Sequence, residues 1–409
     1  MSSTRDQIEV IHPFDYNGVQ LLDGRLKRQF EQIKEFYYSI HNDDILKGFR
    51  ARAGMPAPGK ELGGWYSGDV FHPFGQWLSG FARMFRATGE TKIKEKVVYL
   101  MEEWAKTISD DGFFFYSNKP NAPHYIYDKM VGGLVDIYKY VGNKNALQYL
   151  HKITDWAEEN LERENRALAV EWYTLSENLY RAYEVTGDKR FREFGKVWEY
   201  TEYWGAFARG EDIFEALRTT QHKHYHAYSH VNTLGGAAMA YRITGERHYL
   251  DTIVNAYRFL QETQCFATGG YGPNECFIPP NGLAQTLKDQ VNIRYHFETA
   301  CGSWAAFKLV RYLMTFTGEA FYGDWVERLI YNGVGALLPL NKRGMIMYGS
   351  QYHLYGGQKS LWNAWSCCTG TLPIAVADYH NLIYFYDENS LYINLFIPVS
   401  YTHLTLPTN

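Results

Sequence analysis

Hydrophobic residues recur at helical spacing along most of the chain, and several of these segments end in the same short polar turn. The turn reads Thr-Gly followed by Asp or Glu in four places, and a degraded copy reads KYVGN. The glycines of these turns are Gly89, Gly142, Gly187, Gly245 and Gly318. Glycine directly after a helix supplies a left-handed C-cap, and the acid after it suits the start of a new helix. The pattern therefore predicts repeated helical hairpins, with a period of about 45–70 residues.

Another helical pattern follows these turns, as in residues 189–204 and 247–262. Stacked helical hairpins either form an open solenoid or close into a ring. The unit lengths vary and the inserted loops carry rare residue types. We therefore favour a mainly α fold, an α/α toroid, in which functional loops gather on one rim.

The pattern changes after residue 340, where short β-rich runs replace the helical spacing. The segment IYFYDENSLYINLFI indicates a hairpin whose two strands flank Asp387–Ser390. One hairpin is not stable alone, so we expect the start of a larger, incomplete β module. The predicted division is an α/α-barrel domain over residues 10–340. Residues 341–398 then hold the end of the catalytic domain and the start of a β-sandwich.

The last residues, 399–409, contain the string VSYTHLTLPT, which corresponds to a translated sequencing adapter. We interpret this tail as non-native, so that the natural protein continues past Pro398 and this chain is truncated. A genuine threonine-rich strand is the alternative.

The composition narrows the class of protein. Hydrophobic residues make up 46%, enough for a large core, and the net charge of −4 without a basic block argues against nucleic-acid binding. The N-terminus has no apolar signal segment, and no run is long enough to span a membrane, so we expect a cytoplasmic protein. Aromatic residues reach 17%, an excess that suits a groove stacking the faces of sugars.

The chain has an odd number of cysteines, which favours metal binding or catalysis over a disulfide framework. They are Cys265, Cys276, Cys301, Cys367 and Cys368. The adjacent pair is the most informative: it is either two small buried hydrophobic side chains or part of a metal site. In FETACGSW, Glu298 and Cys301 lie within one helical turn, so both can face one ion. Zinc takes four ligands and prefers thiolates.

Two further motifs carry candidate chemistry. A cysteine beside a cation is a thiolate at neutral pH, and it then needs a partner that protonates a leaving group. Glu275, in the glycine-rich loop TGGYGPNECF, is a candidate general acid/base, with an exposed loop glutamate as the alternative. The segment QHKHYHAYSHVNT holds four histidines, for which we rank sugar-hydroxyl binding above a second metal site.

These motifs resemble those of the β-L-arabinofuranosidases of glycoside hydrolase families 127 and 146. The resemblance covers nearly all of residues 10–398 and includes the segments GGWYSGDVFHPFGQWLSG, SHVNT, TGGYGPNECF, FETACGS and WSCCTGT. The motifs SHVNT, GPNE and CCTGT look closer to family 146. The resemblance implies an (α/α)6 barrel followed by β-sandwich domains. It also implies retaining hydrolysis with a zinc-bound cysteine nucleophile.

The resemblance also implies roles for single residues. Cys367 matches the nucleophile and a zinc ligand, Cys368 and Cys301 match further ligands, and Glu275 matches the general acid/base. We assign Glu298 as the fourth ligand, although the family motif has one residue fewer before the cysteine. On a helix, one residue turns a side chain by about 100°, which would rotate Glu298 away from the zinc unless the backbone adjusts.

A second group of residues is predicted to bind the sugar. His72, His230 and Asn232 match family positions, Glu177 matches a family glutamate, and Asp128 and Gln76 stand where the family usually has histidine. Two aromatic residues complete the group of substrate-binding candidates, which is His72, Gln76, Asp128, Trp172, Glu177, His230, Asn232 and Tyr348.

We therefore expect a glycoside hydrolase that releases L-arabinofuranose or a related sugar from plant-type glycans, with Zn²⁺ as cofactor. Its expected partner is the glycan, not nucleic acid or a membrane, and an oligomer would form through C-terminal domains that this chain lacks. One alternative is an α/α-barrel sugar epimerase or unsaturated-uronide hydrolase. Another is a non-catalytic carbohydrate-binding protein with structural zinc.

Overall fold

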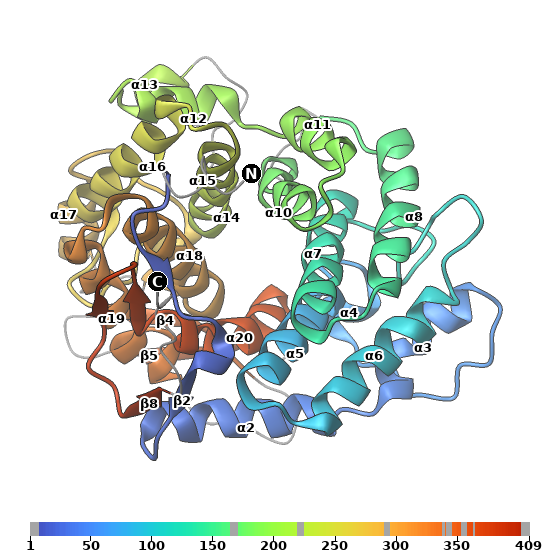
Figure 1. Ribbon diagram of the computed structural model, residues 1–409. Coiled ribbons are helices and arrows are strands. Elements are labelled where there is room, and N and C mark those ends of the chain that lie inside the picture. The colour runs from blue at the N-terminus through green and yellow to red at the C-terminus, as the bar shows by residue number, and fades with distance from the viewer. Residues whose placement is uncertain are drawn as a thin grey trace.

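The computed structural model describes residues 8–163, 171–218, 225–289, 295–337, 340, 346–352, 358–362 and 365–401. Two of the four clustered histidines, His222 and His224, lie outside these residues. The helices form two concentric rings around a central opening (Figure 1). The predicted α/α toroid is therefore confirmed. Within the described residues, the helices lack the combination of length and apolar character that crossing a bilayer requires.

The inner ring consists of helices that are buried on nearly every side. In the described part of the chain they are α5 (Phe74–Thr88), α7 (Pro123–Asp136), α10 (Leu175–Thr186), α15 (Leu234–Thr244), α18 (Thr299–Thr317) and α20 (Cys367–Ala377). Each packs against the next, and α20 packs against α5, which closes the ring. A helix that is apolar all round belongs in a core, and every residue of α20 is buried.

The outer ring consists of helices that keep one face exposed. They are α6 (Thr91–Ala105), α8 (Asn145–Asn160), α11 (Lys189–Val197), α16 (Arg247–Phe259), α19 (Gly323–Asn332) and α2 (Arg25–Ser39). The first five each follow an inner helix along the chain, whereas α2 comes from the N-terminal end and packs against α20. The last hairpin therefore joins the two ends of the chain, and this pairing fixes the position of α20.

Shorter helices fill the connections between the rings. They are α3 (Asn42–Arg52), α4 (Gly64–Ser67), α12 (Thr201–Ala208), α13 (Ile213–Ala216), α14 (Ala227–Asn232) and α17 (Gly282–Asp289).

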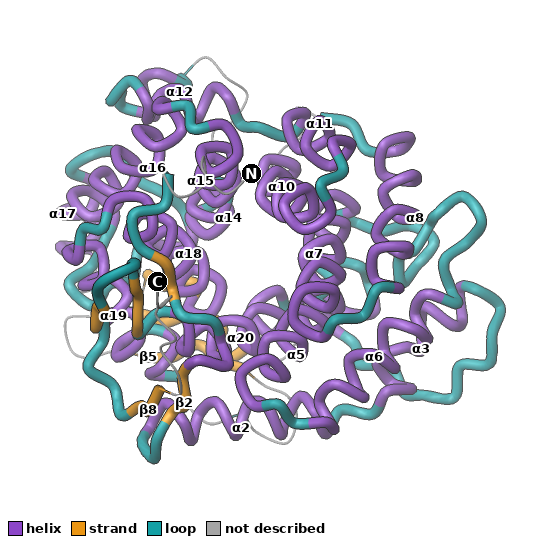
Figure 2. The backbone as a smooth tube through the Cα atoms, in the orientation of Figure 1, coloured by secondary structure: helices purple, strands orange, loops and turns teal. Residues whose placement is uncertain are grey.

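Within the described residues, the strands form three small antiparallel sheets, drawn in orange in Figure 2. The first joins β1 (His12–Pro13), β6 (Tyr384–Tyr386) and β7 (Leu391–Ile393). The second pairs β2 (Val19–Leu21) with β8 (Val399–Tyr401). The third joins β3 (Tyr295–Glu298), β4 (Ile346–Tyr352) and β5 (Gln358–Trp362).

The predicted hairpin is confirmed as β6 and β7, with Asp387 accepting the backbone N–H groups of Asn389 and Ser390 in the turn. The hairpin is not alone, because β1 from the N-terminal end adds a third strand to it. The β4–β5 pair also belongs with the barrel, since it extends β3 and leads towards α20. The domain boundary at residue 340 stays a prediction, but the sixth inner helix lies beyond it.

The tail interpreted as adapter-derived contributes β8, which pairs with β2. Most sequences can form the backbone hydrogen bonds of a strand pair, so this contact does not test the origin of residues 399–409. The adapter origin of this tail stays a prediction. Residues 402–409 lie outside the described part of the chain.

The repeated Thr-Gly-acid turns join the inner helices to the outer ones. All five glycines have φ between 69° and 76° and occupy the left-handed C-cap, as predicted. The acid stands at the N-cap of the next helix, but only Asp188 uses its side chain as a cap. In each Thr-Gly-acid turn the threonine hydroxyl accepts the backbone N–H of the acid, as Thr186 does for Asp188 at 3.1 Å.

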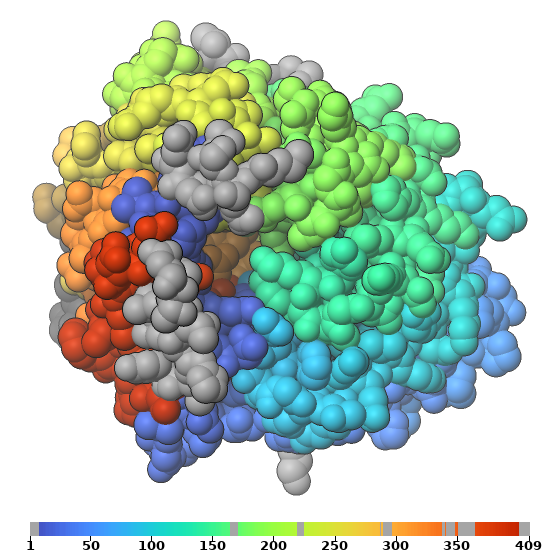
Figure 3. Space-filling view, viewed as in Figure 1, coloured from blue at the N-terminus to red at the C-terminus, as the bar shows by residue number. Residues whose placement is uncertain are grey.

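The face of the ring shown in Figure 3 has a hollow at its centre, a charged cavity of about 330 Å³. Among the residues that line it, Arg83, Arg181 and Arg311 pair with the buried carboxylates of Asp136 and Asp378. These arginines lie in the second halves of α5, α10 and α18. This end of the barrel is therefore held by buried ion pairs, and the N-terminal ends of the inner helices point to the opposite rim.

The turn at Gly187 gives a direct test of the predicted repeat. A Cβ atom at this position would meet nothing within 4 Å, so Gly187→Ala carries only the cost of the left-handed backbone, about 1 kcal/mol of unfolding free energy. Gly205→Ala, inside helix α12, is the control and should be neutral or stabilising, since a Cβ there meets only the end of the Arg209 side chain. Urea denaturation of both variants checks this, and equal effects would contradict it.

Candidate active site

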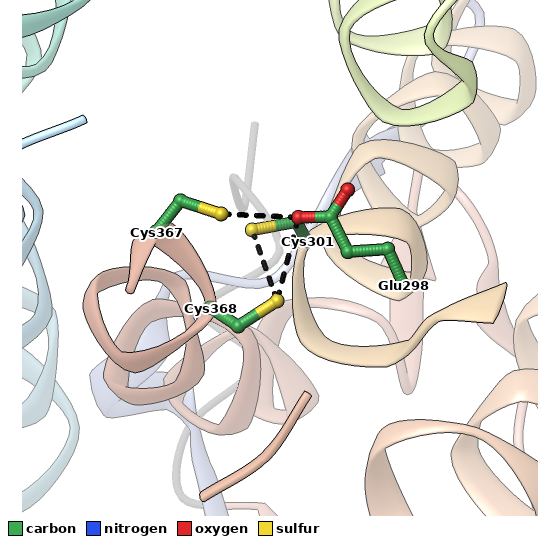
Figure 4. Close-up of side chains that lie close together, drawn as sticks. All are labelled: Glu298, Cys301, Cys367 and Cys368. Carbon is green, nitrogen blue, oxygen red and sulfur yellow. Dashed lines mark hydrogen bonds between the residues drawn. The ribbon is translucent and has the colours of Figure 1, made fainter. Parts of the chain in front are cut away.

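Four potential metal ligands meet where two neighbouring inner helices begin. Cys367 and Cys368 are the first two residues of α20, Cys301 is in the first turn of α18, and Glu298 is the N-cap residue of α18. One ligand atom from each lies within 4.8 Å of the others, and all four side chains are buried (Figure 4). This cluster, which we call the Cys–Glu cluster, could therefore hold a metal ion.

The backbone adjusts at Glu298, so the side chain is not rotated away from the cysteines: Glu298 is not on the helix. It ends strand β3 with an extended backbone, and the helix starts at Thr299. Glu298 Oε1 lies 3.1 Å from Cys367 Sγ and 3.4 Å from Cys368 Sγ, and the latter is 3.6 Å from Cys301 Sγ. The extra residue before Cys301 thus leaves the carboxylate facing all three thiols.

Burial controls the protonation of the cluster. It raises the pKa of Glu298 to about 8, helped by the neighbouring Cys368, and it raises the pKa of Cys301 and of Cys367 well above the usual value. Burial also opposes ionisation of Cys368, but the hydrogen bonds from the two other thiols outweigh it and lower the pKa of Cys368. The cluster on its own therefore keeps most of its protons, and a cation would have to displace them.

A pocket of about 210 Å³ opens beside the cluster, and both proposed catalytic residues, Cys367 and Glu275, line it. Its walls are mostly aromatic, and its lining residues are Trp65, Phe71, Tyr125, Glu171, Tyr173, His226, Tyr228, Glu275, Tyr348 and Cys367. Typical small-molecule pockets span about 300–1,000 Å³, so this one suits a single small ring. Apolar faces with a few convergent polar groups are typical of sugar sites.

The loop that carries Glu275 is held in a strained conformation. Glu275 has φ of 65°, and Gly272 before it approaches Ala227 so closely that a Cβ atom would lie 2.2 Å from the Ala227 side chain. The Tyr271 hydroxyl donates to the carbonyl of Gly302 in α18, which ties the loop to the helix of the cluster. Strain of this kind persists where the surroundings fix a functional position.

His226 links the loop to the cluster. Its Nδ1 lies 2.8 Å from Glu171 Oε1, and its Nε2 lies 3.2 Å from Glu298 Oε2 and 3.7 Å from Glu275 Oε2. Burial lowers the pKa of His226, but the hydrogen bonds with the three glutamates outweigh burial and raise it well above the usual value. A protonated imidazole therefore balances part of the negative charge around the pocket.

Of the predicted sugar-binding residues, only Tyr348 lines this pocket. His230 is one helical turn beyond His226 and is enclosed by the rings of Tyr173, Tyr203 and Tyr225. The other candidates are also buried but do not line this pocket, namely His72, Gln76, Asp128, Trp172, Glu177 and Asn232. Of these, Glu177 lines the charged cavity at the opposite end of the barrel.

Several of these buried candidates already have partners in the barrel. Lys129 and Asn178 bind Asp128, while Lys308 binds Glu177. Gln76 donates to Thr371 in α20. Their contacts hold the inner helices together, and a direct role in sugar binding stays a prediction.

Sequence reasoning missed several polar residues of the pocket, among them His226 and Glu171. The four-histidine segment gave a signal for His226, but the match to His-x-Asn-Thr pointed to His230 instead. Glu171 directly precedes the predicted Trp172 and has φ of 51°, which no sequence pattern indicates.

One protein family matches most of the chain. Residues 18–381 match the family "β-L-arabinofuranosidase, GH127 catalytic domain". The matched family is thus 127, whereas the motifs looked closer to 146. A search of curated proteins found no significant match.

Solved structures with the same fold include glycosidases and an epimerase. A GH127 β-arabinofuranosidase is 17% identical, with a TM-score of 0.71 over 96% of this chain and 65% of its own. A GH127 β-L-arabinofuranosidase from Geobacillus stearothermophilus T6 is also 17% identical, with a TM-score of 0.69 over 93% of this chain and 68% of its own. Cellobiose 2-epimerase from Bacillus thermoamylovorans B4167 is 13% identical, with a TM-score of 0.55 over 85% of this chain and 98% of its own. The chain thus spans just under two thirds of the length of the first relative, and at these identities the likeness shows the fold alone.

The Cys–Glu cluster predicts which cysteines affect metal content. Replacing a residue outside the first ligand shell of a metal already costs about 10–100-fold in affinity, so Cys301→Ser and Cys368→Ser should each cost at least about tenfold in zinc affinity. Cys265→Ser, outside the cluster, is the control and should keep the metal. Zinc titration of the purified variants measures this. Equal affinity in all variants would exclude the cluster as the site.

The buried His72 predicts an acid-sensitive fold. Burial lowers the pKa of His72 to about 3, and the backbone N–H of Phe74 donates to its Nδ1, which requires a neutral ring. Between about pH 6.5 and pH 3, the unfolded chain binds a proton there and the folded chain does not. The unfolding free energy should therefore fall with decreasing pH, by about 1.4 kcal/mol per pH unit from this group.

Denaturation curves at pH 4 to 7 compare the slope in the wild type and in His72→Asn, which keeps an acceptor for Phe74 but does not titrate. The slope should shrink in His72→Asn and stay unchanged in His41→Asn, since His41 is exposed. An unchanged slope in His72→Asn would show that His72 also takes up a proton in the folded state.

Proposed function

The chain belongs to the GH127 family of β-L-arabinofuranosidase catalytic domains, and we propose that it hydrolyses glycosides by a retaining mechanism with Cys367 as nucleophile. The proposed product is L-arabinofuranose or a related sugar, released from a plant-type glycan. The observation that carries the proposal is that Cys367 belongs to the Cys–Glu cluster and also lines a sugar-sized pocket together with Glu275.

Zinc is the metal that we propose for the cluster. Three thiols and one carboxylate oxygen are a donor set that zinc accepts in tetrahedral geometry. With zinc–sulfur bonds of about 2.3 Å, tetrahedral sulfurs stand about 3.8 Å apart. The 3.6 Å between Cys301 Sγ and Cys368 Sγ fits this spacing. Bound zinc would supply the positive charge that keeps Cys367 ionised despite its burial.

The two catalytic residues would divide the reaction into two steps. In the first, Cys367 Sγ attacks the anomeric carbon while Glu275 donates its proton to the leaving glycosidic oxygen, so that a carbon–sulfur bond replaces the carbon–oxygen bond. In the second, the Glu275 carboxylate takes a proton from water, the water oxygen attacks the anomeric carbon, and the thiolate leaves. Two inversions at the same carbon give net retention.

The position of both residues supports these roles. Cys367 lies at the N-terminus of α20, where the helix dipole stabilises an anion. Glu275 is partly exposed to the pocket and lies within reach of His226, which holds the acid/base loop and the cluster at a fixed separation. A general acid/base contributes about 10²–10⁴-fold to the rate, and an oriented carboxyl group is its main structural requirement.

A sugar epimerase remains the second candidate, because cellobiose 2-epimerase shares the ring of helices with this chain. The buried cluster of three thiols and a carboxylate argues for the hydrolase, since the epimerase interpretation does not use thiols.

Substitution of the two catalytic residues tests the hydrolase directly. Cys367→Ser should lower kcat/KM for p-nitrophenyl β-L-arabinofuranoside by at least about 10³-fold, because the serine hydroxyl is not ionised. Glu275→Gln should lose about 10²–10⁴-fold with an alkyl arabinofuranoside but much less in the first step with the p-nitrophenyl compound, whose leaving group needs no proton. Cys265→Ser is the matched control.

Zinc content and thermal unfolding of each variant separate lost chemistry from lost folding. Proton NMR of the first-formed sugar reports its anomeric configuration. Full activity of Cys367→Ser, or a product of inverted configuration, would exclude the proposed mechanism.

A further inference from the structure

Glu171 is a buried carboxylate whose position is set by its backbone. It is 3% exposed, adopts φ of 51°, and stands at the N-terminus of the 3-10 helix η3 (Trp172–Thr174). The backbone N–H and the hydroxyl of Thr174 both donate to the Glu171 carbonyl, at 3.1 and 3.0 Å. Among the described residues, three of the six non-glycine residues with positive φ line the pocket: Phe71, Glu171 and Glu275. The left-handed backbone at Glu171 therefore belongs to the construction of the pocket.

One oxygen of this carboxylate has a partner and the other does not. Oε1 accepts a hydrogen bond from His226 Nδ1 at 2.8 Å, whereas Oε2 is buried without a hydrogen-bond partner among the residues that the structure describes. A buried carboxylate oxygen without a donor is costly, so a donor from a ligand would stabilise it.

The same pocket contains two tyrosine hydroxyls that also lack a hydrogen-bond partner within the described residues. The hydroxyls of Tyr125 and Tyr228 are buried without a hydrogen-bond partner in the described part of the chain, and both residues line the pocket. Burial raises the pKa of both phenols well above the usual value, so they stay protonated and can donate. The pocket thus offers two donors and one charged acceptor to a ligand.

We infer that Glu171, Tyr125 and Tyr228 form a hydrogen-bonding site, which we call the cradle, and that it binds the hydroxyl groups of a neutral sugar. A hydroxyl group both donates and accepts, so a polyol complements this set of groups. Glu171 and Glu275 both line the pocket, and the hydrogen bond with His226 fixes the Glu171 carboxylate there. The Glu171 carboxylate would repel the carboxylate of a uronic acid, so the pocket selects a neutral ring. The inference rests on the proposed function for its substrate class, but the binding role of Glu171 does not depend on turnover.

Calorimetric binding of L-arabinose to the full chain tests the cradle. Glu171→Gln keeps the shape of the side chain but removes the charge of the acceptor, and it should weaken binding by about 10–100-fold, the range of a hydrogen bond to a charged group. Glu199→Gln is the matched control, because Glu199 is a buried carboxylate bound by Tyr180 and Tyr249 away from the pocket. The control should bind within about twofold of the wild type.

Monodeoxy analogues of L-arabinose show whether Glu171 meets a hydroxyl. One analogue should bind the wild type at least about tenfold more weakly than L-arabinose, and the same analogue should show no further loss in Glu171→Gln. A merely structural role of Glu171 would leave these losses additive. D-Galacturonate should bind more weakly than L-arabinose.

The inference is overturned if Glu171→Gln binds L-arabinose as the wild type does, if the wild type does not bind it, or if D-galacturonate binds equally well. If Glu171-dependent binding is found but arabinofuranosides are not hydrolysed, only the proposed function fails. If hydrolysis is found and Glu171→Gln has no effect on binding, only the cradle fails.

Discussion

Three thiols and a carboxylate, buried within 4.8 Å of one another, form the arrangement on which the rest of the site depends. When ionised, such groups repel one another in a low-dielectric interior, so the cluster either keeps its protons or takes up a cation. The fold places these groups at the N-termini of α18 and α20, where the helix dipoles favour negative charge. The same geometry that suits a cation therefore also aims Cys367 into the pocket.

Ring closure brings the members of the cluster together from distant parts of the chain. Helix α20 is the sixth inner helix, and its outer partner α2 comes from the other end of the sequence. Packing of α20 between α18 and α5 sets Cys367 beside Glu298, and the N-terminal ends of the inner helices share one rim with the loops of Glu171, His226 and Glu275. The opposite end is occupied by buried arginine–aspartate pairs. The barrel thus has the candidate site at one rim and the buried ion pairs at the other.

The sequence predicted the repeating architecture because its signal is local. A glycine that ends a helix adopts the left-handed conformation, and the five turn glycines, from Gly89 to Gly318, all do so. The members of the Cys–Glu cluster were also predictable as residue types. The contact of Glu298 was not, because it depends on whether the helix starts before or after that residue. His226 and His230 lie one turn apart, so the helix start at Ala227 decides which of them faces the pocket. The left-handed backbone of Glu171 depends on tertiary contacts that no local pattern encodes.

The most direct measurement is X-ray absorption at the zinc edge of the zinc-loaded protein. The account predicts three sulfur atoms at about 2.3 Å and one oxygen at about 2.0–2.2 Å around the metal. A first shell of nitrogen and oxygen alone would show that zinc binds elsewhere, and Cys367 would then lack the charge that makes it a nucleophile.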